Sequence, residues 1–159
     1  MRPRTEDAAG HSDALVFFGA TGDLAYKMIF PALYELVKDH RLGVPIIGVA
    51  SSPWSTEQLR ARARDSVQAH AGALDDAAFD KLASLLRYVA GNYEDPRTFE
   101  RLREELGTRR RPLHYLAIPP SMFATVIAGL DRAGCTRGAR VVVEKPFGRD
   151  LASARALNR

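Results

Sequence analysis

Runs of apolar residues alternate with stretches of helical periodicity along most of the chain. The run Ala14–Phe18 (ALVFF) is apolar throughout and ends at Gly19, which is typical of a strand buried on both faces. The segment 23–40 carries apolar residues three and four positions apart, as an amphipathic helix does, and we expect Pro31 to kink or split it. By the same criteria, we expect further strands at 44–50, 87–90, 112–118 and 140–144, and helices at 56–70, 75–86, 96–106, 122–133 and from 151 onward.

This alternation predicts an α/β fold: a three-layer, Rossmann-like, doubly wound and mainly parallel sheet with helices on both faces. We expect Ser55 or Thr56 to cap the helix at 56–70, and Ser121 to cap the helix at 122–133. Strands one, four and five should form the covered interior, because they are rich in apolar residues without alternation. In such a sheet the ligand belongs at the carboxyl ends of the strands, where the strand order reverses.

Composition narrows the possible classes of protein. The 159 residues fit one domain, residues 14–159, preceded by a polar tail at 1–13 that we expect to be disordered. A net charge of +4 is too small to indicate nucleic-acid or membrane binding. One cysteine and four scattered histidines argue against a disulfide or a metal site. No apolar stretch resembles a signal peptide or approaches the ~20 residues of a membrane span, so the expected location is cytoplasmic.

A glycine loop follows the first strand and carries the clearest chemical signal. Gly19 permits a tight turn, Gly22 lets a ligand approach the backbone, and Ala25 completes a GxxGxxA pattern. The helix after the loop directs free N–H groups and its positive dipole end toward it, which favours a pyrophosphate. The second strand ends at Ser51-Ser52, which is neither the acidic residue typical of NAD binding nor the arginine typical of NADP binding. The residues alone therefore predict a dinucleotide and leave NAD and NADP open.

Four segments together resemble the glucose-6-phosphate dehydrogenase family. They are 19–36 (GATGDLAYKMIFPALYEL), 47–55 (IGVASSPWS), 115–120 (YLAIPP) and 144–150 (EKPFGRD), in the family's order and at roughly its spacing. The resemblance covers about residues 14–159 and implies a coenzyme domain. It also implies oxidation of glucose 6-phosphate to 6-phosphogluconolactone in the pentose phosphate pathway, with hydride transfer to NADP or NAD.

The resemblance assigns roles to individual positions. The phosphates of the coenzyme are expected at the loop, and the 2′-phosphate position at Ser51. The nicotinamide is expected near the end of the fourth strand, and Lys145, beside a proline that resembles the family's cis-proline, is expected to contact substrate and coenzyme. The expected cofactor-binding residues are Gly19, Ala20, Thr21, Gly22, Asp23, Leu24, Ser51, Ala117, Pro119, Pro120, Phe123 and Lys145.

The sequence departs from the family in three places. Ser51 replaces the usual arginine, which removes a charge-assisted contact of about 1.5–3 kcal/mol and predicts a weakened preference for NADP. Met28 stands where the family commonly has a lysine. The family's general base is a histidine in an RIDHYLGKE-like segment, and this sequence contains none, so we assign no catalytic residue. We expect a chain without its carboxy-terminal catalytic domain, inactive alone, with homo-oligomers formed only by the full-length enzyme.

Some residues of the chain also fit other classes of protein. Tyr34 and Lys38 fit the YxxxK pair of short-chain dehydrogenases, but they lie too early in the chain. A sugar dehydrogenase of the inositol-dehydrogenase type shares the EKP string, and a non-catalytic dinucleotide-binding module is also compatible with the length. The arginines at 101–111 favour a solvated helix face over nucleic-acid contact, because glutamates alternate with them.

Overall fold

The computed structural model describes residues 12–143, and its elements follow the predicted alternation of strands and helices. The strands are β1 (Ala14–Phe18), β2 (Ile46–Ala50), β3 (Leu86–Ala90), β4 (Pro112–Leu116) and β5 (Arg140–Val143). The helices are α2 (Phe30–Lys38), α3 (Thr56–His70), α4 (Asp76–Leu85), α5 (Pro96–Leu106) and α6 (Phe123–Arg132). A π-helical segment (Ala25–Ile29) precedes α2, and a 3₁₀ turn (Pro120–Met122) precedes α6. The expected helix from 151 onward lies outside the described residues.

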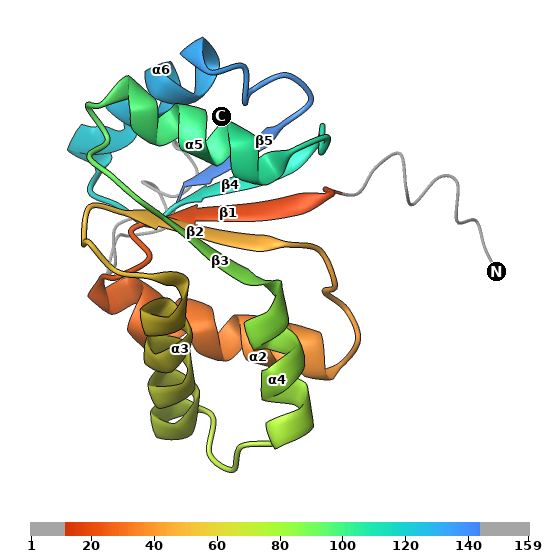
Figure 1. Cartoon of the computed structure of the whole chain (residues 1–159). Coiled ribbons are helices and arrows are strands. Elements are labelled where there is room, and N and C mark those ends of the chain that lie inside the picture. The colour runs from red at the N-terminus through yellow and green to blue at the C-terminus, as the bar shows by residue number, and fades with distance from the viewer. Residues whose placement is uncertain (1–11, 144–159) are drawn as a thin grey trace, which may run out of the picture.

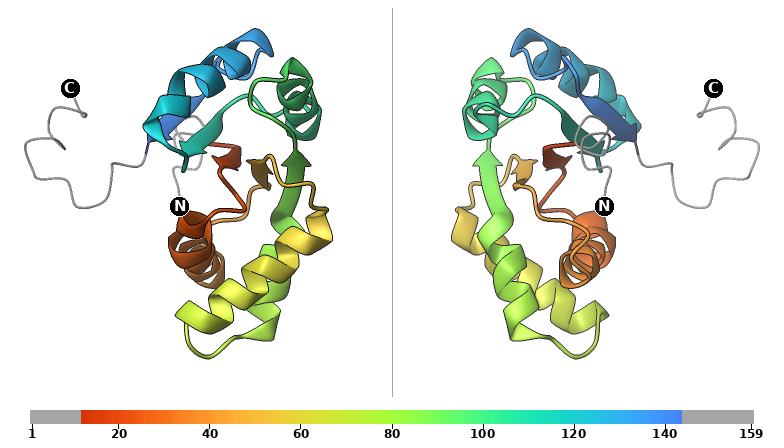
Figure 2. Two further views of the ribbon diagram at one scale, coloured as in Figure 1. Left: turned by 90° about the vertical axis from the view of Figure 1, so that its left-hand side faces the viewer. Right: turned by 90° about the vertical axis from the view of Figure 1, so that its right-hand side faces the viewer.

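Helices cover both faces of a parallel sheet, so the molecule has three layers (Figure 1). The helices α2, α3 and α4 lie on one face, and α5 and α6 lie on the other (Figures 1 and 2). Successive strand residues point into the two hydrophobic cores on opposite faces of the sheet. Phe17 packs toward α2–α4, whereas Phe18 packs toward α5 and α6. Two-sided burial explains the unbroken apolar run of β1 and confirms the predicted three-layer architecture.

The strand order is β3-β2-β1-β4-β5, and all neighbouring strands are parallel. The chain therefore proceeds from β1 toward one edge through β2 and β3, and then returns to the other side of β1 with β4. The carboxyl ends of β1 and β4 border this switch point, which is where ligands bind in open α/β sheets. The left view of Figure 2 looks toward this carboxyl edge.

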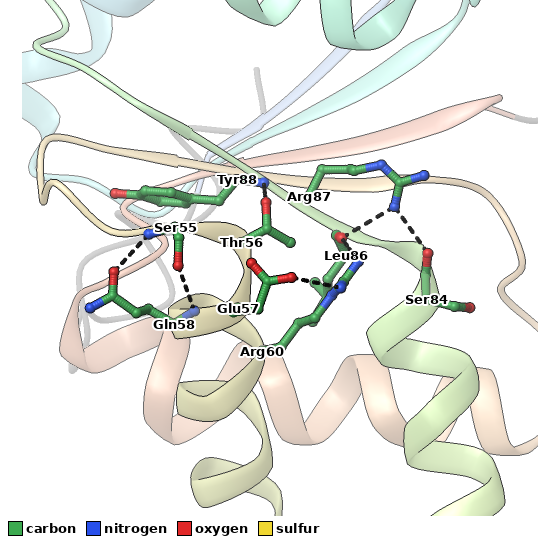
Figure 3. Close-up of polar contacts among 9 residues, drawn as sticks. All are labelled: Ser55, Thr56, Glu57, Gln58, Arg60, Ser84, Leu86, Arg87 and Tyr88. Carbon is green, nitrogen blue, oxygen red and sulfur yellow. Dashed lines mark hydrogen bonds and ion pairs between the residues drawn. The ribbon is translucent and has the colours of Figure 1, made fainter.

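The start of α3 follows the prediction closely. Ser55 is the N-cap: its hydroxyl accepts a hydrogen bond from the Gln58 N–H (3.2 Å), and the Gln58 side chain accepts one from the Ser55 N–H (2.8 Å). These two bonds form a capping box (Figure 3). The Thr56 hydroxyl accepts a hydrogen bond from the Tyr88 N–H (3.2 Å), which ties the helix start to β3.

The arginines of α3 contact neighbouring elements. Arg60 donates to the carbonyl of Leu86 (3.1 Å), the first residue of β3 (Figure 3). The guanidinium of Arg62 lies 4.2 Å from the ring centroid of Tyr26. Arg64 pairs with Asp76 on α4 (3.0 Å), and these contacts hold α3 within its layer.

Pro31 splits the first helix as predicted, and the structure shows how. The helical segment starts at Asp23, passes through a π-helical turn and continues as α2. The Phe30 N–H bonds to the Ala25 carbonyl, five residues back. Pro31 lacks an N–H and its ring clashes with the carbonyl four residues back in a regular helix, and the wider turn relieves this conflict.

Two sequence-based expectations were wrong. Ser121 does not cap α6: the residue before the helix is Met122, no side chain caps it, and Ser121 lies inside the 3₁₀ turn that Pro120 begins. β5 is not in the covered interior but at one edge of the described sheet. Its Val141 and Val142 side chains are 42% and 39% exposed.

Asp13, the last residue of the expected tail, holds the entry to the sheet. Its carboxylate accepts hydrogen bonds from the N–H groups of Arg110 and Arg111, both at 2.8 Å. Burial opposes the charge of Asp13, but these backbone donors outweigh it, and the pKa of Asp13 is lowered. The carboxylate therefore ties the start of β1 to the loop before β4, while residues 1–11 lie outside the described part.

Candidate functional site

The glycine loop lies at the switch point, directly after β1. Gly19 has a positive φ of 84°, and a side chain there would run into the Ala117 carbonyl oxygen after β4. Its N–H donates both to the Val49 carbonyl (2.9 Å) and to the Tyr93 hydroxyl (2.8 Å). Gly19 is therefore required by the fold itself, because both its conformation and its neighbours exclude a Cβ atom.

Gly22 differs from Gly19, because the described chain leaves room for a side chain there. The nearest atom to a Cβ at Gly22 would be the Gly19 carbonyl oxygen at 3.4 Å, an ordinary contact. Gly22 is exposed, and its N–H closes the loop by donating to that same oxygen (3.0 Å). Contacts within the described chain therefore do not require glycine at this position, whereas the close approach of a ligand to the loop backbone would.

The helix that starts at Asp23 gives the loop its electrostatic character. The first N–H groups of a helix have no partner within the helix, and the dipole adds partial positive charge at this end. Asp23 is exposed and Leu24 is half-buried. Ala20 is fully buried and its N–H donates to the Val49 carbonyl (3.3 Å), so its side chain packs inside the protein and holds the loop. This arrangement suits an anion above the loop.

A second element of the site lies at the end of β2. Ser51 is exposed, and the hydroxyl of its neighbour Ser52 lies 2.9 Å from the Thr21 hydroxyl in the glycine loop. The Tyr88 hydroxyl donates toward the carbonyls of Ser52 (2.6 Å) and Ala50 (3.1 Å). Burial raises the pKa of Tyr88 to about 12, so this phenol stays protonated and able to donate. The structure thus links the loop and the corner at Ser51 into one surface.

Tyr93 supports the loop and was not found by sequence reasoning. Its hydroxyl accepts from the Gly19 N–H and donates to the Val49 carbonyl (3.1 Å), so it bridges the ends of β1 and β2. Its ring packs edge-on against Phe18, and burial raises its pKa to about 12. The only signal in the sequence is an aromatic residue in a polar loop after the third strand, which is too common to single out.

The end of β4 borders the other side of the loop. The Ala117 N–H donates to the Phe18 carbonyl (3.1 Å), which holds this segment beside β1. Pro119 and Pro120 are exposed, whereas Phe123 is half-buried and packs against the core beneath α5 and α6. The structure therefore brings Ala117 to the loop, with Pro119 and Pro120 following it along the chain.

Several predicted features fall elsewhere. Lys145 and the proline beside it, Pro146, lie outside the described residues. Met28 is 61% exposed. The hydroxyl of Tyr34 accepts a hydrogen bond from the Asp75 N–H (2.8 Å) in a fully buried position, which confirms that the YxxxK spacing is structural.

Residues 12–143 contain no group of three or more His, Cys, Asp or Glu side chains that could hold a metal ion. In the same range, no helix combines the length and the apolar character needed to cross a membrane.

Comparison with known proteins identifies the family. Residues 16–159 match the family described as "Glucose-6-phosphate dehydrogenase, NAD binding domain". The chain belongs to the glucose-6-phosphate dehydrogenase family. This result confirms the resemblance seen in the GATGDLA and EKPFGRD strings and sets aside the inositol-dehydrogenase alternative.

Individual relatives agree with this assignment. Glucose-6-phosphate 1-dehydrogenase 1 of Mycobacterium tuberculosis is 47% identical over 153 residues, which cover 96% of this chain and 33% of that protein. A crystal structure of the Mycobacterium avium enzyme is similar with a TM-score of 0.82 at 49% identity, covering 93% of this chain and 33% of the other. A glucose-6-phosphate dehydrogenase in complex with its substrate glucose-6-phosphate has a TM-score of 0.73 at 36% identity, over 92% and 33% of the two chains. The chain therefore spans about a third of the length of these glucose-6-phosphate dehydrogenases.

Proposed function

We propose that residues 14–159 form a domain that binds NADP or NAD at the carboxyl edge of the sheet, as the coenzyme-binding part of a glucose-6-phosphate dehydrogenase. The observation that carries the proposal is the position of the glycine loop: it begins at the switch point between β1 and β4 and leads into a helix start. Free N–H groups and a positive dipole end at such a point suit the pyrophosphate of a dinucleotide. The family's description as an NAD binding domain supports the same ligand.

Each predicted residue then has a role in the proposal. The backbone from Thr21 to Leu24 faces the coenzyme phosphates, while Gly19 and Ala20 hold the loop in place. Ser51 lies where the ribose 2′ position is expected and offers a hydroxyl in place of a guanidinium. The segment from Ala117 through Pro119 and Pro120 to Phe123 borders the nicotinamide side, and Lys145 contacts substrate and coenzyme.

The bound dinucleotide would accept a hydride from C1 of glucose 6-phosphate, and the substrate hydroxyl needs a base to take its proton. The family places that base in a segment this sequence does not contain, so the 159-residue chain is expected to bind coenzyme without turning over. The check is the absorbance of reduced nicotinamide after mixing this chain with glucose 6-phosphate and NADP. Measurable reduction would overturn this part of the proposal.

A cytoplasmic location, and homo-oligomers of the complete enzyme, remain predictions from the sequence.

A pair of glycine substitutions tests the site itself. Gly22→Ala is compatible with the fold, because the new Cβ meets only an ordinary contact, but it places a methyl group where the phosphates approach. Gly43→Ala is the matched control, since nothing lies within 4 Å of its Cβ position. We expect NADPH fluorescence titration to show at least tenfold weaker binding for Gly22→Ala and unchanged binding for Gly43→Ala. Equal affinities of Gly22→Ala and the parent chain would contradict the proposed site.

A further inference from the structure

A groove of ≈ 720 Å³ lies at the opposite edge of the sheet from the glycine loop. The loop 109–111, before β4, and the loop 134–138, between α6 and β5, contribute much of its lining. The right view of Figure 2 looks toward this amino edge. A volume of this size falls within the range of ~300–1,000 Å³ that is usual for small-molecule sites. The groove is separate from the proposed dinucleotide site, because the strands of the sheet run between them.

The groove is strongly basic. Its lining includes one carboxylate, Asp131, and five arginines: Arg103, Arg109, Arg110, Arg111 and Arg137. Asp131 accepts a hydrogen bond from the Thr136 hydroxyl (3.0 Å). Arg103 donates to the Gly107 carbonyl (3.1 Å) after α5, an ordinary use of a cation at a helix end. Among residues 12–143, however, Arg109, Arg110 and Arg137 have no carboxylate partner, so no ion pair within this part of the protein neutralises their charges.

Contacts within the protein fix the two loops that carry these arginines. The Asp13 carboxylate binds the N–H groups of Arg110 and Arg111, as described above. Gly138 has a φ of 74° and lies so close to the Arg110 carbonyl that a Cβ would be 2.6 Å from that oxygen. The Cys135 carbonyl accepts a hydrogen bond from Nε2 of the buried His114 (2.9 Å). The backbone that presents the guanidinium groups is therefore arranged before any ligand arrives, which lowers the entropy cost of binding.

We propose that this groove binds a small anion with two or more adjacent phosphate groups, held by Arg109, Arg110 and Arg137. Guanidinium groups bind phosphate oxygens in pairs, and several of them around one concave site favour a ligand with several charges. The residues that line the groove include no aromatic side chain. Single-stranded nucleic acids usually need such side chains for base stacking, so the groove suits the phosphates themselves. Inorganic triphosphate and a nucleoside triphosphate share this chemistry.

Amide NMR on the 159-residue chain can report on both ends of the sheet at once. Glycines mark each end: Gly134 and Gly138 line the groove, and Gly19 and Gly22 mark the proposed dinucleotide loop. Inorganic triphosphate and ATP would be titrated separately at about 0.15 M salt, with NADPH already saturating, so that surface attraction is screened. We expect saturable shifts at Gly134 and Gly138 with both ligands. Comparable affinities for inorganic triphosphate and ATP would show that the groove recognises the phosphates alone. Tighter binding of ATP would show that the phosphate ligand is a nucleotide.

Charge-matched variants make the assignment specific. We expect Arg109→Gln with Arg137→Gln to weaken triphosphate binding at least tenfold. The control, Arg41→Gln with Lys81→Gln, removes the same charge from exposed positions outside the groove and should leave the affinity unchanged. Thermal unfolding of both double variants verifies that they fold. The proposal would be overturned by shifts confined to Gly19 and Gly22, by non-saturable shifts at the groove, or by equal weakening in the control.

This inference stands apart from the proposed coenzyme function. Loss of NADPH binding with retained triphosphate shifts at Gly134 and Gly138 would count against the dinucleotide site alone. Retained NADPH binding without those shifts would count against the groove alone.

Discussion

The Tyr93 hydroxyl lies 2.8 Å from the backbone nitrogen of Gly19, although 74 residues separate the two in the chain. The same hydroxyl donates to the Val49 carbonyl, so one phenol connects the glycine loop with the strand beside it. The conformation of the loop therefore depends on Tyr93, a residue that supports the loop through its backbone and does not need to touch a ligand.

Tyr93→Phe removes this connection while keeping the ring. Loss of a partly buried hydrogen bond costs about 1 kcal/mol of unfolding free energy, and we expect a fall of this size in urea unfolding. Coenzyme affinity should fall about fivefold, which corresponds to about 1 kcal/mol, because the loop is held less firmly. Tyr34→Phe is the control: it removes a buried hydroxyl bond to the Asp75 N–H, far from the loop. The role of Tyr93 would be supported if both variants lose similar stability but only Tyr93→Phe binds the coenzyme more weakly. Equal coenzyme affinities of the two variants would contradict it.

Ser51→Arg restores the cation that the family usually has at the end of β2. A charge-assisted contact with the 2′-phosphate contributes about 1.5–3 kcal/mol, so NADP binding should tighten by roughly 10- to 150-fold while NAD binding changes little. The control is Ser84→Arg, which adds the same charge on the exposed surface of α4. Parallel fluorescence titrations with both reduced coenzymes measure the effect. A gain for NAD equal to that for NADP would place Ser51 away from the 2′ position.

Gly19→Ala and Gly72→Ala separate backbone strain from steric conflict. Both glycines have positive φ, at 84° and 80°, but a Cβ at Gly72 meets nothing within 4 Å, whereas at Gly19 it meets the Ala117 carbonyl. We expect Gly72→Ala to cost about 1 kcal/mol and Gly19→Ala to cost more than about 3 kcal/mol of unfolding free energy. Thermal or urea unfolding gives both values, and equal costs would show that the close approach at Ala117 is relieved by movement.

The buried His114 makes stability depend on pH. Burial lowers its pKa below the ordinary value of 6.5, and the hydrogen bond to the Cys135 carbonyl opposes this only in part. Between the lowered folded pKa and about 6.5, the unfolded chain therefore binds more protons than the folded one. The unfolding free energy should thus fall as pH drops through this window, because stability rises with pH wherever the unfolded state binds more protons.

His114→Gln tests this explanation, because the amide keeps a donor for the Cys135 carbonyl but does not titrate there. We expect the loss of melting temperature below about pH 6.5 to become smaller in this variant. His70→Gln changes an exposed histidine at the end of α3 and serves as the control. An unchanged acid profile in His114→Gln would assign the pH dependence to other groups.

Local features of the sequence predicted much of the fold, and long-range contacts explain most of what was missed. The strand at β1 and the helix cap at Ser55 are signalled by residues close together in the sequence, and the structure confirms both. The failure at Ser121 has a local cause, because Pro120 starts a 3₁₀ turn that displaces the expected cap. The exposure of Val141 depends on the place of β5 at the edge of the described sheet, which an apolar run does not encode.

The candidate site shows the same division. Strand ends are predictable from periodicity, so the sequence could place Gly19 and Ser51 at one edge of the sheet, and the family resemblance added Ala117. Tyr93 could not be found, because its role arises only when the loop after β3 meets the loop after β1. The hydroxyl pair of Thr21 and Ser52 likewise requires that β2 lie beside β1.

The π-helical turn before Pro31 acts as a one-residue insertion in the first helix. The wider turn accommodates this extra residue locally, because its hydrogen bond from Phe30 to Ala25 spans five residues where a regular α-helical turn spans four. The loop-bearing turn at Asp23 and the buried Leu33 and Tyr34 therefore stay parts of one continuous helix. Deleting one residue from 25–29 would restore the regular hydrogen-bond ladder, into which Pro31 does not fit, so natural variants that lack this residue should lack the proline as well.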